Sequence, residues 1–429
     1  MGLTKSKLIV SKVEASALFI VIVIALVIGL ICSSLILVAY NYKCRISDNL
    51  GWKRIEDNLN SSIHLLLSDS ELITFDTPQT IDLYEEGTDS VFIKKLHWGI
   101  YEVGVVKSFY KRFSLEKKFI YGYQPDDFIK SAIYLVDEGR PLSIAGTTFI
   151  KGTCYLPEAG IKTAYIEGTS YEGEEKVRGK IEKSKNTLPK PDPEICKRMK
   201  DYLLGNYDVT DSTDVLNGLN ADTIRRSFFQ STLIIKMKKK SSLSKVFLSG
   251  NIIITADTTL VIDSSAKLND VILFAPGVEI LEGFNGSLQI VAKDSVKIGK
   301  SCNLKYPSSV CLLKTDFKVM QPFIILKEDS KVSGLVFTTT DVQDLQFTKI
   351  IIEKNALVEG QVFSDGFVDI QGKVHGNVTC KTFSLKTPSS TYENHLLNAT
   401  IDNSRLSKYY IGSSILFTER KKRLIKYLD

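Results

Sequence analysis

A run of 26 residues without a charged side chain, from Ala15 to Tyr40, constrains the fold more than any other feature of the sequence. At about 1.5 Å per residue, a helix of this length exceeds the ~30 Å hydrocarbon core of a bilayer. It is also longer than the about 7–15 apolar residues of a cleaved signal peptide. We therefore predict a transmembrane helix over residues 15–40, preceded by a short basic tail over residues 1–14.

Basic residues lie on both sides of this run, so charge alone does not set its orientation. They are Lys5, Lys7 and Lys12 before it, and Lys43, Arg45, Lys53 and Arg54 after it. A short tail followed by a large domain is the usual arrangement of an anchor whose N-terminus is inside. We expect a single-pass protein of the plasma (inner) membrane whose C-terminal domain is periplasmic or otherwise extracytoplasmic.

An amphipathic helical pattern follows the apolar run. Apolar residues recur at steps of three and four, with charged residues between them: Trp52, Ile55, Leu59, Ile63 and Leu66. We expect the helix to continue as an amphipathic stalk over residues 41–70. This two-part helix resembles the N-terminal helix of type IV pilins and pseudopilins, which carries a glutamate near its start. The resemblance implies a role in assembly for Glu14; the alternative is a plain single-span anchor with a helical stalk.

Apolar and polar residues alternate from about Thr74 to Gln124, which is typical of half-buried strands. Residues 71–140 are therefore expected to form a small β-rich head with antiparallel strands.

From near Pro141 onward, glycine recurs two residues after an apolar residue. Examples are Val332-Ser333-Gly334, Val358-Glu359-Gly360 and Val374-His375-Gly376. Short β-branched runs lie between these motifs, with a repeat of about 18–26 residues, as a parallel β-solenoid requires. We predict a mainly β protein with first solenoid rungs over residues 141–185 and the main solenoid (β-helix) over residues 246–390. An antiparallel sandwich is the competing interpretation.

The stretch IIIEKNALVEGQVFSDGFVDIQGKVHGNVTCKTFSL, at residues 350–385, resembles bactofilins and related polymer-forming β-helices. That resemblance implies solenoid geometry and filaments formed at the membrane by end-to-end contacts.

Two segments break the repeat. Residues 186–245 are expected to form a helical and loop insertion, with Asp192 as the cap of a helix, Pro193 at its first position and Gly205 at its end. Residues 391–429 are expected to form a C-terminal extension whose last residues fold as a capping helix.

Candidate chemistry is sparse. The four histidines, His64, His97, His375 and His395, are far apart, and no Cys-x-x-Cys occurs, so we expect no metal site and no cofactor. Asp257, Asp263 and Asp270 have a spacing that can bring them together at successive corners, although aspartate is also a common turn residue. No catalytic residue is assigned. A net charge of +6 over 429 residues gives no reason to expect nucleic acid.

The cysteines allow two states. Cys302 and Cys311, nine residues apart, can form a disulfide across a loop outside the cytoplasm, and Cys154 can pair with Cys196. The alternative is that they remain buried, reduced thiols.

These features favour a membrane-anchored, non-enzymatic structural or assembly protein of the cell envelope. Its expected partners are the membrane, other envelope proteins and further copies of itself through the solenoid, in a pilus-like or secretion-related setting. The alternative is a membrane-tethered β-helix enzyme or binding protein that acts on surface polysaccharide.

Overall fold

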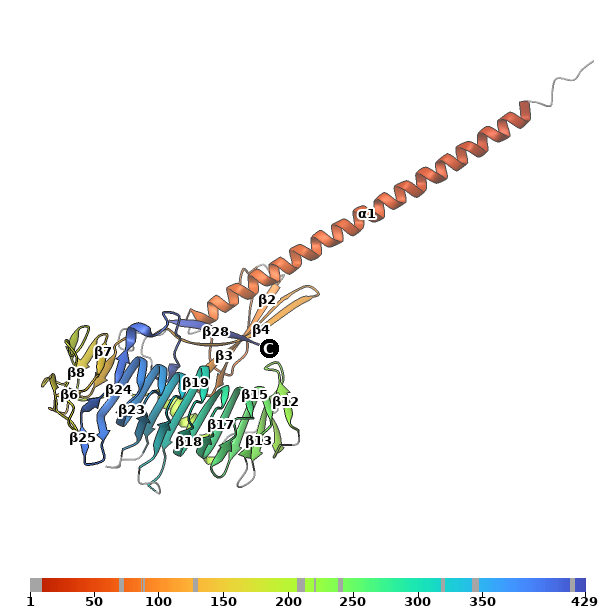
Figure 1. Ribbon diagram of the computed structural model, residues 1–429. Coiled ribbons are helices and arrows are strands. Elements are labelled where there is room, and N and C mark those ends of the chain that lie inside the picture. Colours follow the sequence, from red (N-terminus) through yellow and green to blue (C-terminus); the bar gives the residue numbers. More distant parts are fainter. Residues whose placement is uncertain are drawn as a thin grey trace, which may run out of the picture. The chain divides into compact units, whose positions relative to one another are not determined.

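The computed structural model describes residues 10–68, 73–85, 87, 89–125, 130–206, 213–219, 221–237, 242–317, 321–341, 347–416 and 421–429, and side chains from residue 17 onward. The protein is mainly β: the described residues form 28 strands and two α-helices (Figure 1). It divides into two compact units. The first comprises Met1–Ser62, Thr80–Phe92 and Lys107–Glu116, and the second comprises Ile63–Gln79, Ile93–Val106 and Lys117–Asp429.

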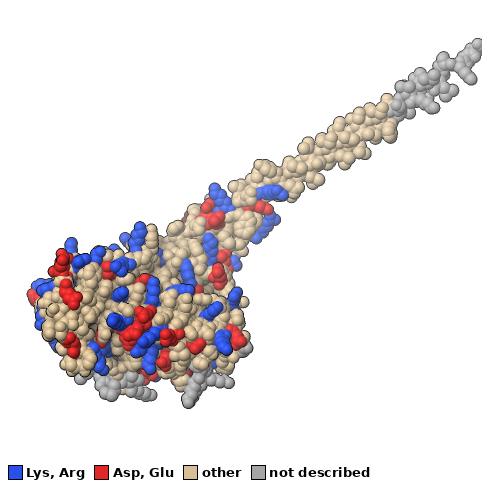
Figure 2. Space-filling model, in the orientation of Figure 1, with Lys and Arg blue, Asp and Glu red and all other residues tan. Residues whose placement is uncertain are grey.

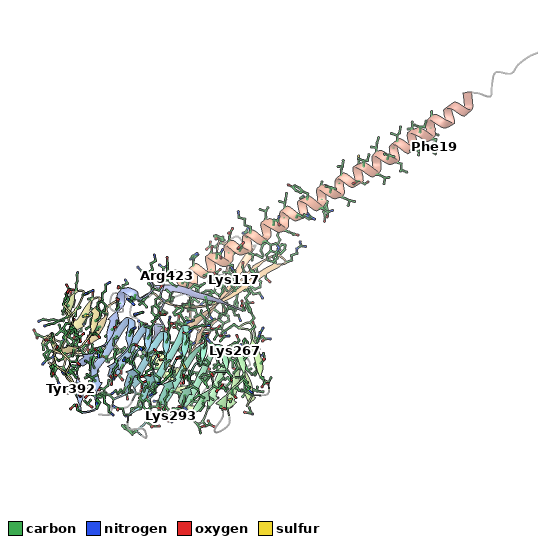
Figure 3. The ribbon with its side chains drawn as sticks, in the orientation of Figure 1. Phe19, Lys117, Lys267, Lys293, Tyr392 and Arg423 are labelled. Atoms are coloured by element: carbon green, nitrogen blue, oxygen red, sulfur yellow. The ribbon has the colours of Figure 1, made fainter. Side chains whose placement is uncertain are left out.

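One continuous helix, α1 (Val10–Leu67), contains both the apolar run and the amphipathic stalk. Its most apolar window has a mean hydropathy of 3.2 and is not buried, so the helix is long and apolar enough to span a membrane. Phe19, labelled in Figure 3, is 68% exposed. The predicted stripe is buried at Ile55, Leu59, Ile63 and Leu66, whereas its first residue, Trp52, is 47% exposed. The helix therefore follows the sequence pattern from the apolar run to the end of the amphipathic repeat.

The head is a five-stranded sheet in the order β1-β2-β3-β4-β28. Its strands are β1 (Gln79–Ile81), β2 (Asp89–Trp98), β3 (Tyr101–Tyr110), β4 (Phe113–Tyr123) and β28 (Lys422–Leu428). Two-residue turns join β2 to β3 and β3 to β4, as is usual for antiparallel neighbours. The predicted capping helix at the C-terminus is wrong, because β28 pairs antiparallel with β4. The edge of β4 provides backbone partners that a local sequence pattern does not reveal.

Long parallel strands form the larger part of the second unit, here called the parallel stack (Figure 1). Its central strands are β15 (Phe247–Ala256), β17 (Lys267–Ile280), β18 (Asn285–Ile298), β19 (Asn303–Lys314), β21 (Lys331–Thr340), β23 (Leu357–Ile370) and β24 (Lys373–Lys386). Shorter strands beside them are β16 (Leu260–Ile262), β20 (Phe323–Leu326) and β22 (Lys349–Ile352). The parallel pairing excludes the antiparallel sandwich.

Six of these strands form a closed cycle. The first part of β18 pairs with β19 and its last part with β20. These continue to β21 and β22, which both pair with β23. A single strand thus borders two neighbours at different points of its length, which requires the strands to bend between two faces of the stack.

The glycine motif marks equivalent positions on successive strands. Gly334 pairs in register with Gly360, and Gly360 with Gly376. All three have positive φ, at 141°, 145° and 153°. A Cβ atom on Gly360 would lie 2.0 Å from the carbonyl oxygen of Gly334, so only glycine fits where the backbones approach this closely.

The valines of the same motif build the core. Val332, Val358 and Val374 are in register and fully buried. They belong to one hydrophobic cluster that continues from strand to strand through the stack. Stacking therefore buries apolar side chains that a single strand would leave exposed to water.

The order of strands in the stack differs from their order in the chain. Strands β5 (Ile133–Leu135) and β7 (Phe149–Lys151) pair in parallel with β24 and with β27 (Thr400–Asp402). Likewise β6 (Leu142–Ala145) pairs with β26 (His395–Leu397). Strand β5 falls in the segment expected to belong to the head, but it joins the stack. The expected first rungs thus follow the C-terminal strands in space, and β8 (Cys154–Leu156), β9 (Ile161–Thr163) and β10 (Ile181–Lys183) lie beyond them. A short strand β25 (Thr391–Glu393) pairs antiparallel with β24, and two 3-10 turns, η1 (Asn403–Arg405) and η2 (Ser414–Leu416), follow β27.

The expected insertion contains one helix and four strands. Helix α2 (Pro193–Leu204) is capped by Asp192, whose side chain accepts hydrogen bonds from two backbone N–H groups, and ends at Gly205 with φ 76°. The rings of Tyr202 and Phe274 stack at 4.7 Å between centroids, which holds α2 against β17. The rest forms β11 (Thr213–Asn217), β12 (Thr223–Arg226), β13 (Thr232–Met237) and β14 (Ser242–Leu243), which belong to the stack rather than to a loop.

Candidate functional site

Unpaired strand edges at the two ends of the parallel stack are the strongest candidate for a functional surface. At one end, here called the β11 end, β11 pairs with β13 and β12 pairs with β15. Within the described residues, no further strand pairs with the other edge of β11 or β12. Val215, in the middle of β11, is 40% exposed. The hydroxyl of Ser231 donates to Asp214 at 2.7 Å, and Arg226 pairs with the same carboxylate, so the short strands here are held by polar contacts.

The opposite end, here called the β10 end, consists of β9 and β10. Among the described residues, β10 pairs with β8 alone and β9 with β6 alone. All three residues of β10 are exposed, and Ile181 is 50% exposed. Charged side chains surround the edge, and Lys183 pairs with Glu158 at 2.5 Å. Short strands and surface charge are the usual means by which proteins limit unspecific edge pairing.

The geometry of the two ends determines what can bind there. An unpaired edge presents backbone N–H and C=O groups that can accept a further strand. Because the strands of the stack are parallel, the β11 end of one copy offers the edge complementary to the β10 end of another. Such contacts are head-to-tail, and they can repeat to form an open filament rather than a closed ring. The same edges also fit an extended segment of another protein.

The three aspartates considered for catalysis have separate local roles. Asp257 is exposed in the turn between β15 and β16. Asp263 accepts hydrogen bonds from the backbone and hydroxyl of Ser265, and these bonds lower the pKa of its carboxyl. Asp270 pairs with Lys426 of β28. No contact in the described residues joins the three carboxylates; Asp263 stabilises a turn, and Asp270 a contact with β28.

The histidines and cysteines form no metal cluster in the described part of the chain. His375 lies in β24 opposite Glu359 of β23, and its partial burial lowers its pKa. His97 stacks on Phe75 with 4.0 Å between ring centroids, and burial lowers its pKa to about 4. Both side chains are half-buried and pack against neighbouring side chains.

Of the two states open to Cys302 and Cys311, the structure has the free thiols. Cys302 precedes β19 and donates to the carbonyl of Leu281 at 3.1 Å, whereas Cys311 is buried within β19. A strand rises about 3.3 Å per residue, which keeps the sulfurs well beyond disulfide distance. Cys154 and Cys196 are also free. The side chain of Glu14 lies outside the described residues.

Sequence reasoning missed both candidate ends. Val215 falls in the segment expected to be an insertion, and Ile181 in the segment expected to form the first solenoid rungs. The β-branched pattern of residues 213–217 indicates a strand, but nothing local shows that it is terminal. No family model matches this sequence, and no curated protein or solved structure is significantly similar to it.

Proposed function

We propose that this protein is a membrane-anchored, non-enzymatic structural component of the cell envelope, and that its parallel stack is a β-solenoid that joins further copies or other envelope proteins. The observation that carries the proposal is the pair of parallel strand edges at the β11 end and the β10 end, where no further strand pairs within the described residues, in a chain that also has a membrane-length apolar helix. A structural role needs only these surfaces and the anchor.

Three features support the solenoid. The strands are parallel and in register, the glycine positions stack on one another, and strand β18 borders two different neighbours along its length. On the visible face of the stack, basic and acidic side chains are interspersed (Figure 2). Such a mixture keeps a surface soluble and does not favour a ligand of one particular charge.

The proposed location is the plasma membrane, with the stack on the extracytoplasmic side. Cys44 tests this orientation, because it is exposed and lies four residues beyond Tyr40. A membrane-impermeant maleimide should label Cys44 in intact spheroplasts, and a Cys44→Ser variant is the control. Labelling that requires permeabilised membranes would reverse the proposed orientation.

Head-to-tail association is tested by cysteine pairs at the two ends. In a Cys32→Ser/Cys44→Ser background, Val215→Cys and Glu182→Cys together should give a ladder of crosslinked oligomers in native membranes. Either substitution alone should give dimers at most. A pair of equally exposed positions away from the ends, Lys267→Cys and Lys354→Cys, is the matched control. Equal ladders from both pairs, or none from either, would argue against assembly through the ends.

The pilus-like setting rests on the two-part helix and on Glu14. Glu14→Ala should reduce recovery of the protein in large detergent-resistant complexes, whereas Glu56→Ala, exposed on the same helix, should not. Normal complexes from the Glu14→Ala variant would remove the pilin-like part of the proposal and leave the solenoid part intact.

A further inference from the structure

The turn between β3 and β4 carries a compact group of basic and aromatic side chains, here called the tip cluster: Tyr110, Lys111, Arg112 and Phe113. The Lys111 ammonium lies 5.0 Å from the centre of the Tyr110 ring, and the Arg112 guanidinium lies 5.0 Å from that of Phe113. Lys111 is exposed, and the Arg112 side chain is 70% exposed. The aromatic rings orient these cations, and the Lys111 ammonium stays exposed to a ligand.

The tip cluster is fixed against the segment of α1 that follows the apolar run. Arg112 pairs with Asp48 at 2.5 Å, and the ring centres of Phe113 and Trp52 are 5.2 Å apart. Gly51 makes this possible, since a Cβ atom there would lie 2.9 Å from the Phe113 ring. The turn is therefore held at a defined height on the helix.

That height places the cations near the bilayer surface. Asp48 is eight residues beyond Tyr40, about 12 Å along a helix, and the headgroup layer is about 5–7 Å thick. The apolar run would span about 39 Å against a ~30 Å core, so α1 must tilt, which lowers one of its sides toward the lipid. Long basic side chains can then reach the headgroups. Tyr40 and Tyr42, 65% and 67% exposed, have the amphipathic character of interfacial anchors.

Most of the charge at this level is positive, although two of the cations are also paired, Arg54 with Asp89 and Lys107 with Glu116. Residues 40–54 and 107–113 contain seven cations and one carboxylate, Asp48. The cations are Lys43, Arg45, Lys53, Arg54, Lys107, Lys111 and Arg112. Their excess of six equals the net charge of +6 of the entire chain, so the remaining residues are neutral in sum. A cluster of four to eight basic residues next to a span is typical of binding to anionic lipid.

We propose that the tip cluster binds the anionic headgroups of the bilayer in which α1 is anchored, and thereby selects the direction in which the helix tilts. The proposal rests on the membrane anchoring proposed above. It assigns the turn between β3 and β4 to the lipid surface rather than to a protein partner, because the cations lie within about 12 Å along the helix of the end of the apolar run and carry the charge opposite to that of the lipid.

Hydrogen exchange of the full-length protein in nanodiscs tests the proposal. Amides of residues 108–114 should exchange at least about fivefold more slowly in discs with 30% phosphatidylglycerol than in phosphatidylcholine discs, the factor that one surface cation contributes. In Lys111→Glu/Arg112→Glu the difference should disappear. Lys267→Glu/Lys354→Glu, which makes the same change of charge on the stack (Lys267 in Figure 3), should retain it.

A salt series on the unaltered protein provides a second measurement that does not depend on a variant's folding. The lipid-dependent protection should fall steeply between 50 mM and 500 mM NaCl, because screening shortens the range of surface charge interactions. Equal exchange in both lipids, or protection that resists salt and charge reversal, would overturn the proposal. Failure of the protein to insert into either disc would instead contradict the membrane anchoring on which it rests.

Discussion

The side-chain oxygen of Gln289 accepts a hydrogen bond of 2.9 Å from the backbone N–H of Ile100, which is 189 residues away in the sequence. The amide nitrogen of the same side chain donates to the carbonyl of Trp98 at 3.1 Å. One glutamine in β18 therefore satisfies the N–H of Ile100 and the C=O of Trp98, one on each side of Gly99. Both hydrogen bonds are buried. Gly99 has φ 62°.

Replacing Gln289 should destabilise this contact strongly. Gln289→Ala leaves one buried N–H and one buried C=O without a partner, at a cost of about 2–3 kcal/mol. Gly99→Ala should cost at least as much, because its Cβ would lie 2.2 Å from the Gln289 oxygen. Chemical unfolding in detergent measures both. Gly139→Ala, with positive φ and no neighbour within 4 Å, is the control and should cost only about 1–2 kcal/mol.

A buried ion pair in the first unit should depend on pH. Asp89, with a side chain 1% exposed, accepts hydrogen bonds from Arg54 and Asn58, both at 2.6 Å, and the bond from Arg54 is the main reason its pKa is lowered. A lowered pKa in the folded state means that the ionised carboxylate stabilises the fold above the unfolded pKa, near 4, and that this contribution is lost as pH falls through the folded value.

Asp89→Asn should therefore cost about 2–3 kcal/mol at pH 7 and progressively less below pH 4. Thermal unfolding at a series of pH values measures this difference. Glu158→Gln, which removes an ion pair with both side chains 75% exposed, should leave the melting temperature unchanged. A loss that is the same at pH 7 and pH 3 would show that packing, and not charge, accounts for the effect of Asp89.

The glycine register of the stack predicts a second contrast. Gly360→Ala forces a Cβ atom to within 2.0 Å of the Gly334 carbonyl oxygen, at a φ that side chains rarely adopt. We expect a loss of about 3–5 kcal/mol from left-handed strain and overpacking together. Gly218→Ala, with φ 84° and no neighbour within 4 Å, isolates the strain alone. Similar stabilities for the two variants would mean that the close approach of the backbones is not restrictive.

Thiol reactivity should separate the cysteines by burial. Desolvation raises the pKa of Cys154 to about 12 and that of Cys380 well above its usual range, so both should stay unmodified in the folded protein. Cys44 is exposed and should react within minutes. Alkylation in denaturant without a reductant, followed by mass spectrometry, should modify all seven cysteines. Any cysteine that remains blocked would indicate a disulfide absent from this structure.

The sequence predicts the elements whose determinants are local. The cap formed by Asp192 and the end at Gly205 define α2 because each acts within a few residues. The glycines at 334, 360 and 376 predict stacked strands because each strand carries the same steric requirement.

Elements that depend on distant partners could not be predicted in this way. The last residues form β28 because the edge of β4 is available about 300 positions earlier, and a local pattern contains no information about that edge. The same holds for the two ends of the stack. Val215 and Ile181 are terminal only because other strands occupy the positions between them, which is a property of the whole assembly of strands.

The pairing of Ile133 with Val378 has a consequence for the time at which the fold can be completed. Strands β5 to β10 are synthesised before the strands on which they stack, and the partner of Ile133 is made 245 residues later. At ~5–20 residues per second, that wait lasts about 12–50 s. During this interval the apolar faces of residues 130–185 have no place to dock. Helix α1, which is long and apolar enough to span a membrane, is made before this segment.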